Sequence, residues 1–348
     1  MSHLSSYIES EKFYEKVQGC IAGVAIGDAM GMPASSYLPE QIVERYGVID
    51  RLLDAPAGHP YHDGFRKGRI TDDTELTLIV IDMLLKDGEP TPIGMGRRIL
   101  NWAEENRLLE SGVIGPSTRR AIIGLMEGKD PRETGKYGTT NGAPMKISPI
   151  GVINVGNRTK LLDDVEKVCM PSHWTSVAIS SAAAVAGAIS EALTENSTVD
   201  SVVKEAVLCG ELGAGRGNPI ACPSIPKKIQ LAIQLIENEK DPMKQARILY
   251  DLIGTDVSCV SSIPSVFGVF YGSGGDPMKA VITAANLGGD TDTIASMVGG
   301  IVGAYKGIKA FPSDIVKTVE NENHIDFSEI ATKLIDYMRK KHCWTSSH

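Results

Sequence analysis

The sequence predicts an all-α protein that forms a single compact multi-helix domain. Apolar residues recur at helical spacing along most of the 348 residues. Several of these stretches start with a capping residue followed by proline, as at Thr91-Pro92 and Asp276-Pro277. There is no series of alternating strands, and no strand precedes a Gly-x-Gly-x-x-Gly motif. Because no proline- or serine-rich linker divides the chain, we expect one domain over residues 1–348, with its core at about 11–341.

The predicted helices follow one another along the chain. The first runs from Glu11 to Ala25 and becomes small and apolar as it approaches Gly27 and Asp28. An Ala- and Ser-rich stretch at 175–194 predicts a tightly packed central helix. Residues 213–217 are rich in glycine but lack the Lys-Ser/Thr ending of a phosphate loop, so we expect a plain loop there. The other predicted helices start at Thr71 or Asp72 and at about Thr291, or span 92–106, 116–126, 198–209, 225–238, 242–253, 276–287, 312–321 and 327–341.

Composition excludes two classes of partner. The net charge of −8 and pI near 5.5 argue against a nucleic-acid binder, which needs a basic face. No stretch has the unbroken apolar length of a membrane span, and the N-terminus lacks the pattern of a signal peptide. The six cysteines include no Cys-x-x-Cys pair, which favours reduced thiols and a cytoplasmic location over disulfides or a zinc site.

Two short acidic clusters share an unusual pattern although most of the chain separates them. One is Thr71-Asp72-Asp73-Thr74, and the other is Asp290-Thr291-Asp292-Thr293, which follows Gly288-Gly289. In the plainest interpretation they are helix caps, with Thr71 or Asp72 and Asp290 as N-caps and Asp72 with Glu75 as a capping box. Capping does not need three or four oxygen donors in a row, however. Carboxylate and hydroxyl oxygens are hard donors that suit Mg²⁺ or Mn²⁺.

Together with three further stretches, these clusters resemble the signature of the ADP-ribosylglycohydrolase family, which includes the dinitrogenase reductase-activating glycohydrolases. Residues 23–31, with Gly27-Asp28-Ala29-Met30-Gly31, resemble the family's N-terminal Gly-Asp-Ala-x-Gly stretch. Residues 141–146 are similar to its Asn-Gly-x-x-Met-Arg stretch, and Ser172-His173 to its Thr-His pair before an Ala-rich helix. The matches occur in the family's order through most of the chain, and the fold that they imply is one interlocked all-α domain.

The resemblance implies a binuclear Mg²⁺ site, with Mn²⁺ as a possible substitute. Asp292 would bridge the two ions, and Asp73 and Asp292 would be catalytic. Thr71, Asp72 and Asp73 would complete the coordination of one ion, and Asp290 and Thr293 that of the other. Water would attack the anomeric carbon of a ribose through an oxocarbenium-like transition state. The expected substrates are ADP-ribose conjugates, either a small riboside or an ADP-ribosylated protein. The residues expected to bind substrate or to support the site are Asp28, Asn141, Gly142, His173, Gly288 and Gly289.

The chain departs from the family pattern at its usual acids. A glutamate that family members carry near Pro33 falls at about Ser35, and a second acid used by some members falls near Val113. The general acid is therefore not visible in the sequence. Two alternatives to an ADP-ribose hydrolase stay open: a nucleosidase-like hydrolase of a small N-riboside, and a non-catalytic relative similar to the lens crystallins of this family. The leaving group and the oligomeric state stay open as well.

Overall fold

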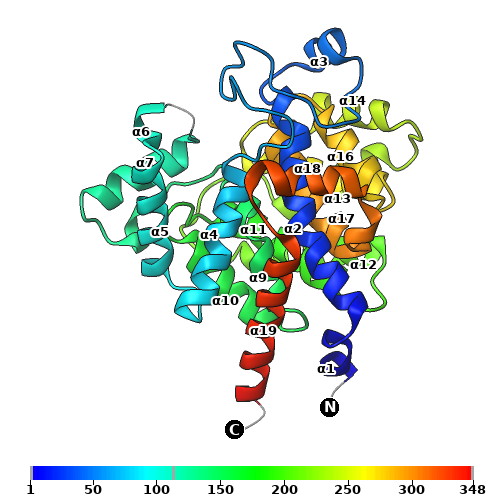
Figure 1. Cartoon of the computed structure of the whole chain (residues 1–348). Coiled ribbons are helices and arrows are strands. Elements are labelled where there is room, and N and C mark those ends of the chain that lie inside the picture. The colour runs from blue at the N-terminus through cyan, green and yellow to red at the C-terminus, as the bar shows by residue number, and fades with distance from the viewer. Residues whose placement is uncertain (1–2, 112–113, 346–348) are drawn as a thin grey trace.

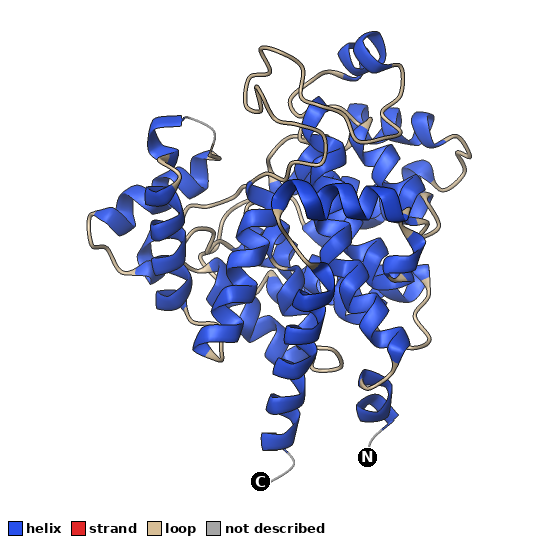
Figure 2. Ribbon diagram, in the orientation of Figure 1, coloured by secondary structure: helices blue, strands red, loops and turns tan. Residues whose placement is uncertain are grey.

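The structure, a computed structural model, describes residues 3–111 and 114–345, and its regular elements are helices (Figure 2). Between these described residues only isolated β-bridges occur, such as Tyr37 with Gly289. The all-α prediction is therefore confirmed. No helix in the described ranges combines the length and the apolar character that crossing a bilayer requires.

The helix bounds are as follows: α1 His3–Ile8, α2 Glu11–Gly31, η1 Met32–Ala34, α3 Pro39–Tyr46, α4 Asp72–Asp87, α5 Pro92–Glu105, α6 Leu108–Ser111, α7 Pro116–Met126, α8 Pro131–Thr134, η2 Pro144–Lys146, α9 Ser148–Ile153, α10 Arg158–Cys169, α11 Ser176–Ala192, α12 Val199–Gly213, α13 Ile225–Ile236, α14 Pro242–Leu252, α15 Cys259–Gly272, α16 Pro277–Ala285, α17 Thr291–Lys306, η3 Ile308–Ala310, α18 Ser313–Asn323 and α19 Phe327–Thr345.

The centre of the fold is the pair of helices α2 and α17, which run side by side although they come from opposite ends of the chain (Figure 1). Every fourth residue of α2 on the facing side is a glycine, and small residues of α17 lie opposite. A Cβ atom added to Gly23 would lie 2.1 Å from the carbonyl oxygen of Gly299, and one added to Gly27 would lie 1.9 Å from that of Ala295. The two backbones are therefore in contact, a packing that only residues with little or no side chain allow.

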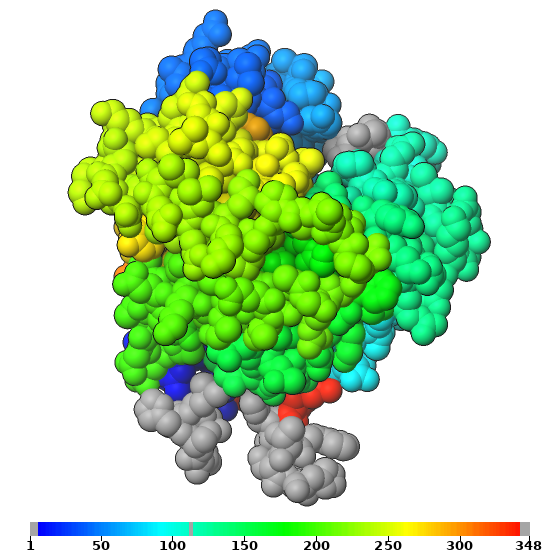
Figure 3. Space-filling view, turned by 180° about the vertical axis from the view of Figure 1, so that it is seen from behind, coloured from blue at the N-terminus to red at the C-terminus, as the bar shows by residue number. Residues whose placement is uncertain are grey.

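The other helices surround this pair. The Ala-rich α11 packs against α9, α10, α12 and α17, which gives it the central place expected from its composition. Helices α5, α6 and α7 form a lobe at the side of the molecule, and α3 with the irregular segment 47–71 lies at one end, opposite both termini (Figure 1). Seen from behind, the surface is formed largely by residues of the second half of the chain, from about 150 to 270 (Figure 3).

Most predicted helices are confirmed within a few residues, and the differences have physical causes. Helix α2 runs six residues past its predicted end at Ala25. Glycine has a low helix propensity, but the glycines of α2 are the residues that pack on α17, and this packing stabilises the helix. The helices that were not predicted are α1, α3, α6, α8, α9, α10 and α15. Helix α15 contains Pro264, which ordinarily ends a helix, and α9 is a single short helix of six residues. Gly213 ends α12, and the loop expected there begins one residue later. Cys20, Cys169, Cys209, Cys222 and Cys259 are free thiols.

Gly27→Ala should destabilise the protein by about 2–3 kcal/mol, because the new methyl group would meet the Ala295 carbonyl and force α2 and α17 apart. Elsewhere in a helix the same change would be stabilising. The measurement is urea unfolding followed by circular dichroism. Gly215→Ala is the control, since a Cβ there has no neighbour closer than 3.7 Å. Equal stability of Gly27→Ala and wild type would contradict the close contact.

Candidate active site

The two acidic clusters meet in the structure, at the adjoining N-terminal ends of α4 and α17. Thr293 Oγ1 donates to Asp73 Oδ2 at 3.2 Å, and Thr71 Oγ1 donates to the same oxygen at 3.1 Å. A hydrogen bond thus joins residues that are 220 positions apart in the sequence. All three side chains are buried.

Among the six side chains predicted to bind metal, only one serves as a helix cap. Thr71 is the N-cap of α4 and accepts from the backbone N–H of Asp73. Asp290 occupies the N-cap position of α17, but its side chain accepts no capping hydrogen bond. The predicted Asp72–Glu75 capping box is wrong, because Asp72 is already helical and Glu75 accepts from the indole N–H of Trp102. The carboxylates of the clusters are therefore left for another role.

A cavity of about 290 Å³ opens over the clusters. Four of the six predicted metal ligands line it: Asp72, Asp290, Asp292 and Thr293. Thr71 and Asp73 lie behind them, tied to Thr293 by the hydrogen bonds described above. The rest of the wall comes from Ser35 and Ser36, from the 47–71 segment, from the start of α7 and from the loops around Asn141 and Val257.

Asp28 holds the start of α4 in place from its position on α2. Its Oδ2 accepts from the backbone N–H groups of Thr71 and Thr74, at 2.9 and 3.2 Å, and from the Thr74 hydroxyl at 2.5 Å. Its Oδ1 is buried and has no hydrogen-bond partner. Asp28 does not line the cavity, so it acts on the site by fixing Thr71 and the acids that follow.

The predicted Asn141-Gly142 loop reaches the cavity and contacts the second cluster. Asn141 Nδ2 donates to Asp290 Oδ2 at 2.5 Å and to Ser262 Oγ at 3.2 Å. Gly142 lies against the ring of His173, where an added Cβ would lie 2.7 Å from Cε1. A larger residue at 142 would therefore displace the loop from the cavity wall.

His173 does not reach the cavity, contrary to the expectation that it contacts substrate. Its side chain is fully buried behind the loop, with Nε2 2.9 Å from the Thr140 hydroxyl and Nδ1 2.8 Å from the Ser172 hydroxyl. Lys146, also buried, donates to the Gly142 carbonyl oxygen and to Ser172. Both ring nitrogens are thus used in supporting the loop. Burial, and next the charge of Lys146, lower the pKa of His173 well below its ordinary value.

Gly288 and Gly289 shape the backbone and are not among the residues that line the cavity. Both have positive φ angles, 82° and 76°, as expected for the tight turn before α17. Gly289 pairs with Tyr37 and accepts from the backbone N–H of Ser36, while an added Cβ would lie 2.5 Å from the Thr255 carbonyl oxygen. Their role is to bring the second cluster against the segment that carries Ser35.

Asp292 is held by two residues that were not predicted as site residues. Ser35 Oγ donates to its Oδ1 at 2.9 Å, and His62 Nε2 lies 3.1 Å from its Oδ2. Ser35 is the position where the family's glutamate was expected. The sequence offered one signal for His62, the motif His59-Pro-Tyr-His62 in a stretch without helical periodicity. Val113, the other expected acid position, lies outside the described residues.

Burial and mutual repulsion disturb the ionisation of the clustered acids. Burial, offset in part by hydrogen bonds from Thr74 and Thr71, raises the pKa of Asp28 to about 7. Burial and the charge of Asp292 raise the pKa of Asp72 to about 6 and that of Asp290 well above its ordinary value. Burial and the neighbouring acids also raise the pKa of Asp73.

Asp292 differs from the other acids of the clusters. Burial acts to raise its pKa, but His62 and the Ser35 hydroxyl together hold that pKa below its ordinary value. In return, Asp292 raises the pKa of His62 against the opposing effect of burial. Asp292 is therefore the carboxylate most strongly favoured in its charged form.

The carboxylate and hydroxyl oxygens of the two clusters are of the kind that binds cations, although these side chains do not converge on a single point. In the described parts of the chain, no three His, Cys, Asp or Glu side chains are grouped closely enough to hold a metal ion as they stand. Asp73 Oδ1 is nevertheless buried without a hydrogen-bond partner. Among the described residues, no lysine or arginine forms an ion pair with Asp72, Asp73, Asp290 or Asp292. Asp73 and Asp292 are buried and Asp72 and Asp290 are half-buried, and carboxylates gathered in this way need a compensating cation.

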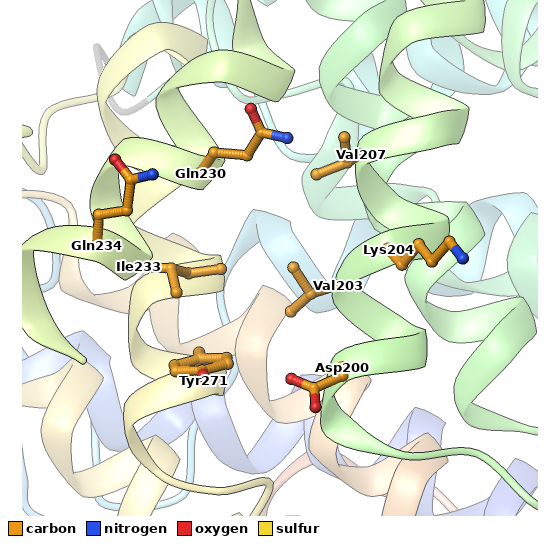
Figure 4. A pocket seen from close by; sticks show the side chains of 8 residues that line it. All are labelled: Asp200, Val203, Lys204, Val207, Gln230, Ile233, Gln234 and Tyr271. Atoms are coloured by element: carbon orange, nitrogen blue, oxygen red, sulfur yellow. The ribbon is translucent and has the colours of Figure 1, made fainter.

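A second concavity, of about 500 Å³, lies between α12, α13 and Tyr271 of α15 (Figure 4). Its charged lining residues are Asp200 and Lys204, and Val203, Val207 and Ile233 give it an apolar wall. It shares no lining residue with the acidic cavity. Because it gathers no group of acids, we place the candidate site at the smaller cavity.

Known proteins are similar to this chain over most of its length. The model of the family described as ADP-ribosylglycohydrolase matches residues 9–343. An uncharacterized protein of Escherichia coli K12, YegU, is 30% identical over 329 residues, which cover 94% of this chain and 98% of that protein. A solved structure described as an ADP-ribosylglycohydrolase-related protein complex matches with a TM-score of 0.69 at 21% identity, over 94% of this chain and all of its own.

More distant relatives have assigned activities. The ADP-ribosylarginine hydrolase Tri1 of Pseudomonas putida GB-1 is 24% identical, over 94% of this chain and 79% of its own. The ADP-ribosyl-[dinitrogen reductase] glycohydrolase of Rhodospirillum rubrum is 23% identical, over 86% of this chain and 88% of its own.

Without divalent cations, the clustered acids should make the protein less stable as the pH rises from about 4 to about 7, and the lowered pKa of His173 should act in the opposite direction. The pKa values of Asp28 and Asp72 are about 7 and about 6 in the folded chain, above the ordinary 3.8 of the unfolded chain. The folded state therefore binds more protons in this window, and the stability that this contributes is lost as the two groups ionise.

Urea unfolding in EDTA at pH 5 and pH 8 measures this effect. The acids should lower the free energy of unfolding at pH 8 relative to pH 5 by an amount on the order of a few kcal/mol, and the lowered pKa of His173 should offset part of this change. The stability of Asp28→Asn relative to wild type should therefore be higher at pH 8 than at pH 5. The same pH dependence in Asp28→Asn and in wild type would contradict the raised pKa of Asp28.

Proposed function

The chain belongs to the ADP-ribosylglycohydrolase family, and on that premise we propose that it hydrolyses the glycosidic bond at the anomeric carbon of a ribosyl group, with ADP-ribose conjugates as substrates. The observation that carries the proposal is the meeting of the two acidic clusters at one cavity. The relatives named as hydrolases of ADP-ribosylarginine and of ADP-ribosyl-dinitrogen reductase support this substrate class.

We further propose that two Mg²⁺ ions, or Mn²⁺ in their place, serve this reaction. Thr71, Asp72, Asp73, Asp290, Asp292 and Thr293 would hold them, since all six offer hard oxygen donors. The unpartnered Asp73 Oδ1 and the raised pKa values of the acids support a cationic occupant. Such ions would orient vicinal ribose hydroxyls and make a water molecule more acidic.

The residues of the chain itself would bind and orient the substrate. Asn141 holds Asp290 at the cavity wall, and Ser35 with His62 holds Asp292. Asp292 is the acid of the clusters most strongly favoured in its charged form, which suits it to the bridging role. Gly142 lets the loop lie against the ring of His173 and so keeps the loop backbone at the cavity wall.

The start of α7 favours a phosphate-bearing substrate. Ser117 and Thr118 are the second and third residues of this helix, Thr118 lines the cavity, and no side chain caps the helix at Gly115. The N-terminus of a helix attracts anions because its first N–H groups lack partners. An ADP-ribose diphosphate would find donors there.

The size and charge of the cavity favour the second candidate, hydrolysis of an uncharged N-riboside. About 290 Å³ is at the lower end of the range for small-molecule sites, roughly 300–1,000 Å³. Among its described lining residues there is no lysine or arginine, whereas three are aspartates. Tyr61, Ile114, Met145 and Val257 give a partly apolar wall suited to a nucleobase.

A hydrolysis screen separates the candidates. ADP-ribosylarginine, ADP-ribosylserine peptides and free nucleosides are each incubated with protein plus MgCl₂, or with EDTA. We expect hydrolysis of at least one class with Mg²⁺, loss with EDTA and recovery with Mn²⁺. Hydrolysis that survives EDTA would contradict the metal-dependent proposal, and failure on all classes would favour a non-catalytic relative.

Asp292→Ala should weaken metal binding and turnover together, by roughly 100-fold or more in kcat/KM, because the carboxylate proposed to serve both ions is lost. Calorimetric titration with Mg²⁺ and kinetics on the substrate found in the screen measure the two effects. Asp82→Ala is the control, since Asp82 pairs with Lys86 and Arg98 on the surface of α4. If Asp292→Ala binds two ions with unchanged affinity, Asp292 is not the bridge.

A further inference from the structure

His62 contacts the proposed cation site from a segment that the acidic clusters do not include. The side chain of His62 is 6% exposed, yet it lines the cavity beside Asp292. Within the described residues, the only hydrogen-bond partner of its ring is Asp292, and its Nδ1 is buried without one. A histidine that served packing alone would have no reason to contact an acid of the site.

The segment around His62 is organised so that this ring is held in one orientation. His59 Nδ1 accepts from the backbone N–H groups of Tyr61 and His62, at 3.2 and 3.0 Å, which makes a tight turn. The rings of His59 and Phe65 lie on His62 at centroid distances of 5.0 and 5.3 Å. The backbone N–H of Phe65 donates to the His62 carbonyl at 2.9 Å.

The two oxygens of Asp292 are thereby held from two directions. Ser35, just after η1, donates to Oδ1, and His62 occupies Oδ2. Each carboxylate oxygen keeps a second lone pair, so these contacts leave Asp292 able to bind a cation. Groups that orient a ligand in this way commonly contribute about 10–100-fold to metal affinity.

We propose that His62 is a positioning residue of the cation site, which holds Asp292, through Nε2, in the orientation in which the carboxylate binds metal. The inference rests on the proposed function, because it takes the clusters to bind divalent cations. His62 thus holds the carboxylate oxygen of Asp292 that the Ser35 hydroxyl does not contact.

Calorimetric titration with MgCl₂ and MnCl₂ tests the proposal in wild type, His62→Leu, His62→Gln and Phe65→Leu. His62→Leu should bind either ion about 10–100-fold more weakly. His62→Gln should recover affinity to within about threefold, since the glutamine amide donates from nearly the position of Nε2. Phe65→Leu, which removes a ring that packs on His62 but keeps the Nε2 donor, should weaken binding by less than His62→Leu does.

Each outcome has one meaning. Unchanged affinity in His62→Leu, or equal losses in His62→Leu and Phe65→Leu, would overturn the positioning role while leaving the proposed function intact. Equal losses in His62→Leu and His62→Gln would overturn the role of the Nε2 donor. If wild type binds no divalent cation, the metal proposal fails, and this inference fails with it.

Discussion

The backbone contact between α2 and α17 is the constraint on which the rest of the molecule depends. Glycines at every fourth position of α2 let the helices approach until Gly23 and Gly27 touch carbonyl groups of α17. This contact fixes Asp28 beside the start of α17, and Asp28 in turn binds the backbone of Thr71 and Thr74 at the start of α4. Two helix N-termini from distant parts of the sequence are therefore brought to one place, and the acidic clusters come with them.

This arrangement destabilises the folded protein electrostatically. Buried carboxylates repel one another, and burial alone already disfavours their charged forms. The protein offsets only part of this cost, with Asn141 on Asp290 and with Ser35 and His62 on Asp292. A fold that depended only on stability would place apolar residues there. The retained acids are better explained by a cationic ligand whose binding lowers the energy of the folded state.

The sequence predicted local features well and three-dimensional neighbours poorly. Caps followed by proline marked α5 and α16, and the shared pattern of the two acidic clusters predicted that they form one site. His62 was missed because it lies in an irregular segment, where no periodicity indicates which way a side chain faces. His173 was expected at the cavity because Ser172-His173 resembles the Thr-His pair of the family. Its burial behind the Asn141 loop depends on packing that the sequence does not reveal. Gly288 and Gly289 were placed correctly in a turn, though they lie against Pro39 and Thr255 and do not line the cavity.

The most direct test of the account is anomalous diffraction from crystals grown with Mn²⁺. The account predicts two peaks between the N-terminal ends of α4 and α17, within coordination distance of Asp72, Asp73, Asp290 and Asp292, with Asp292 touching both. Crystals that contain Mn²⁺ elsewhere while these four carboxylates bind none would contradict it, and the clusters would then have to be explained without a metal.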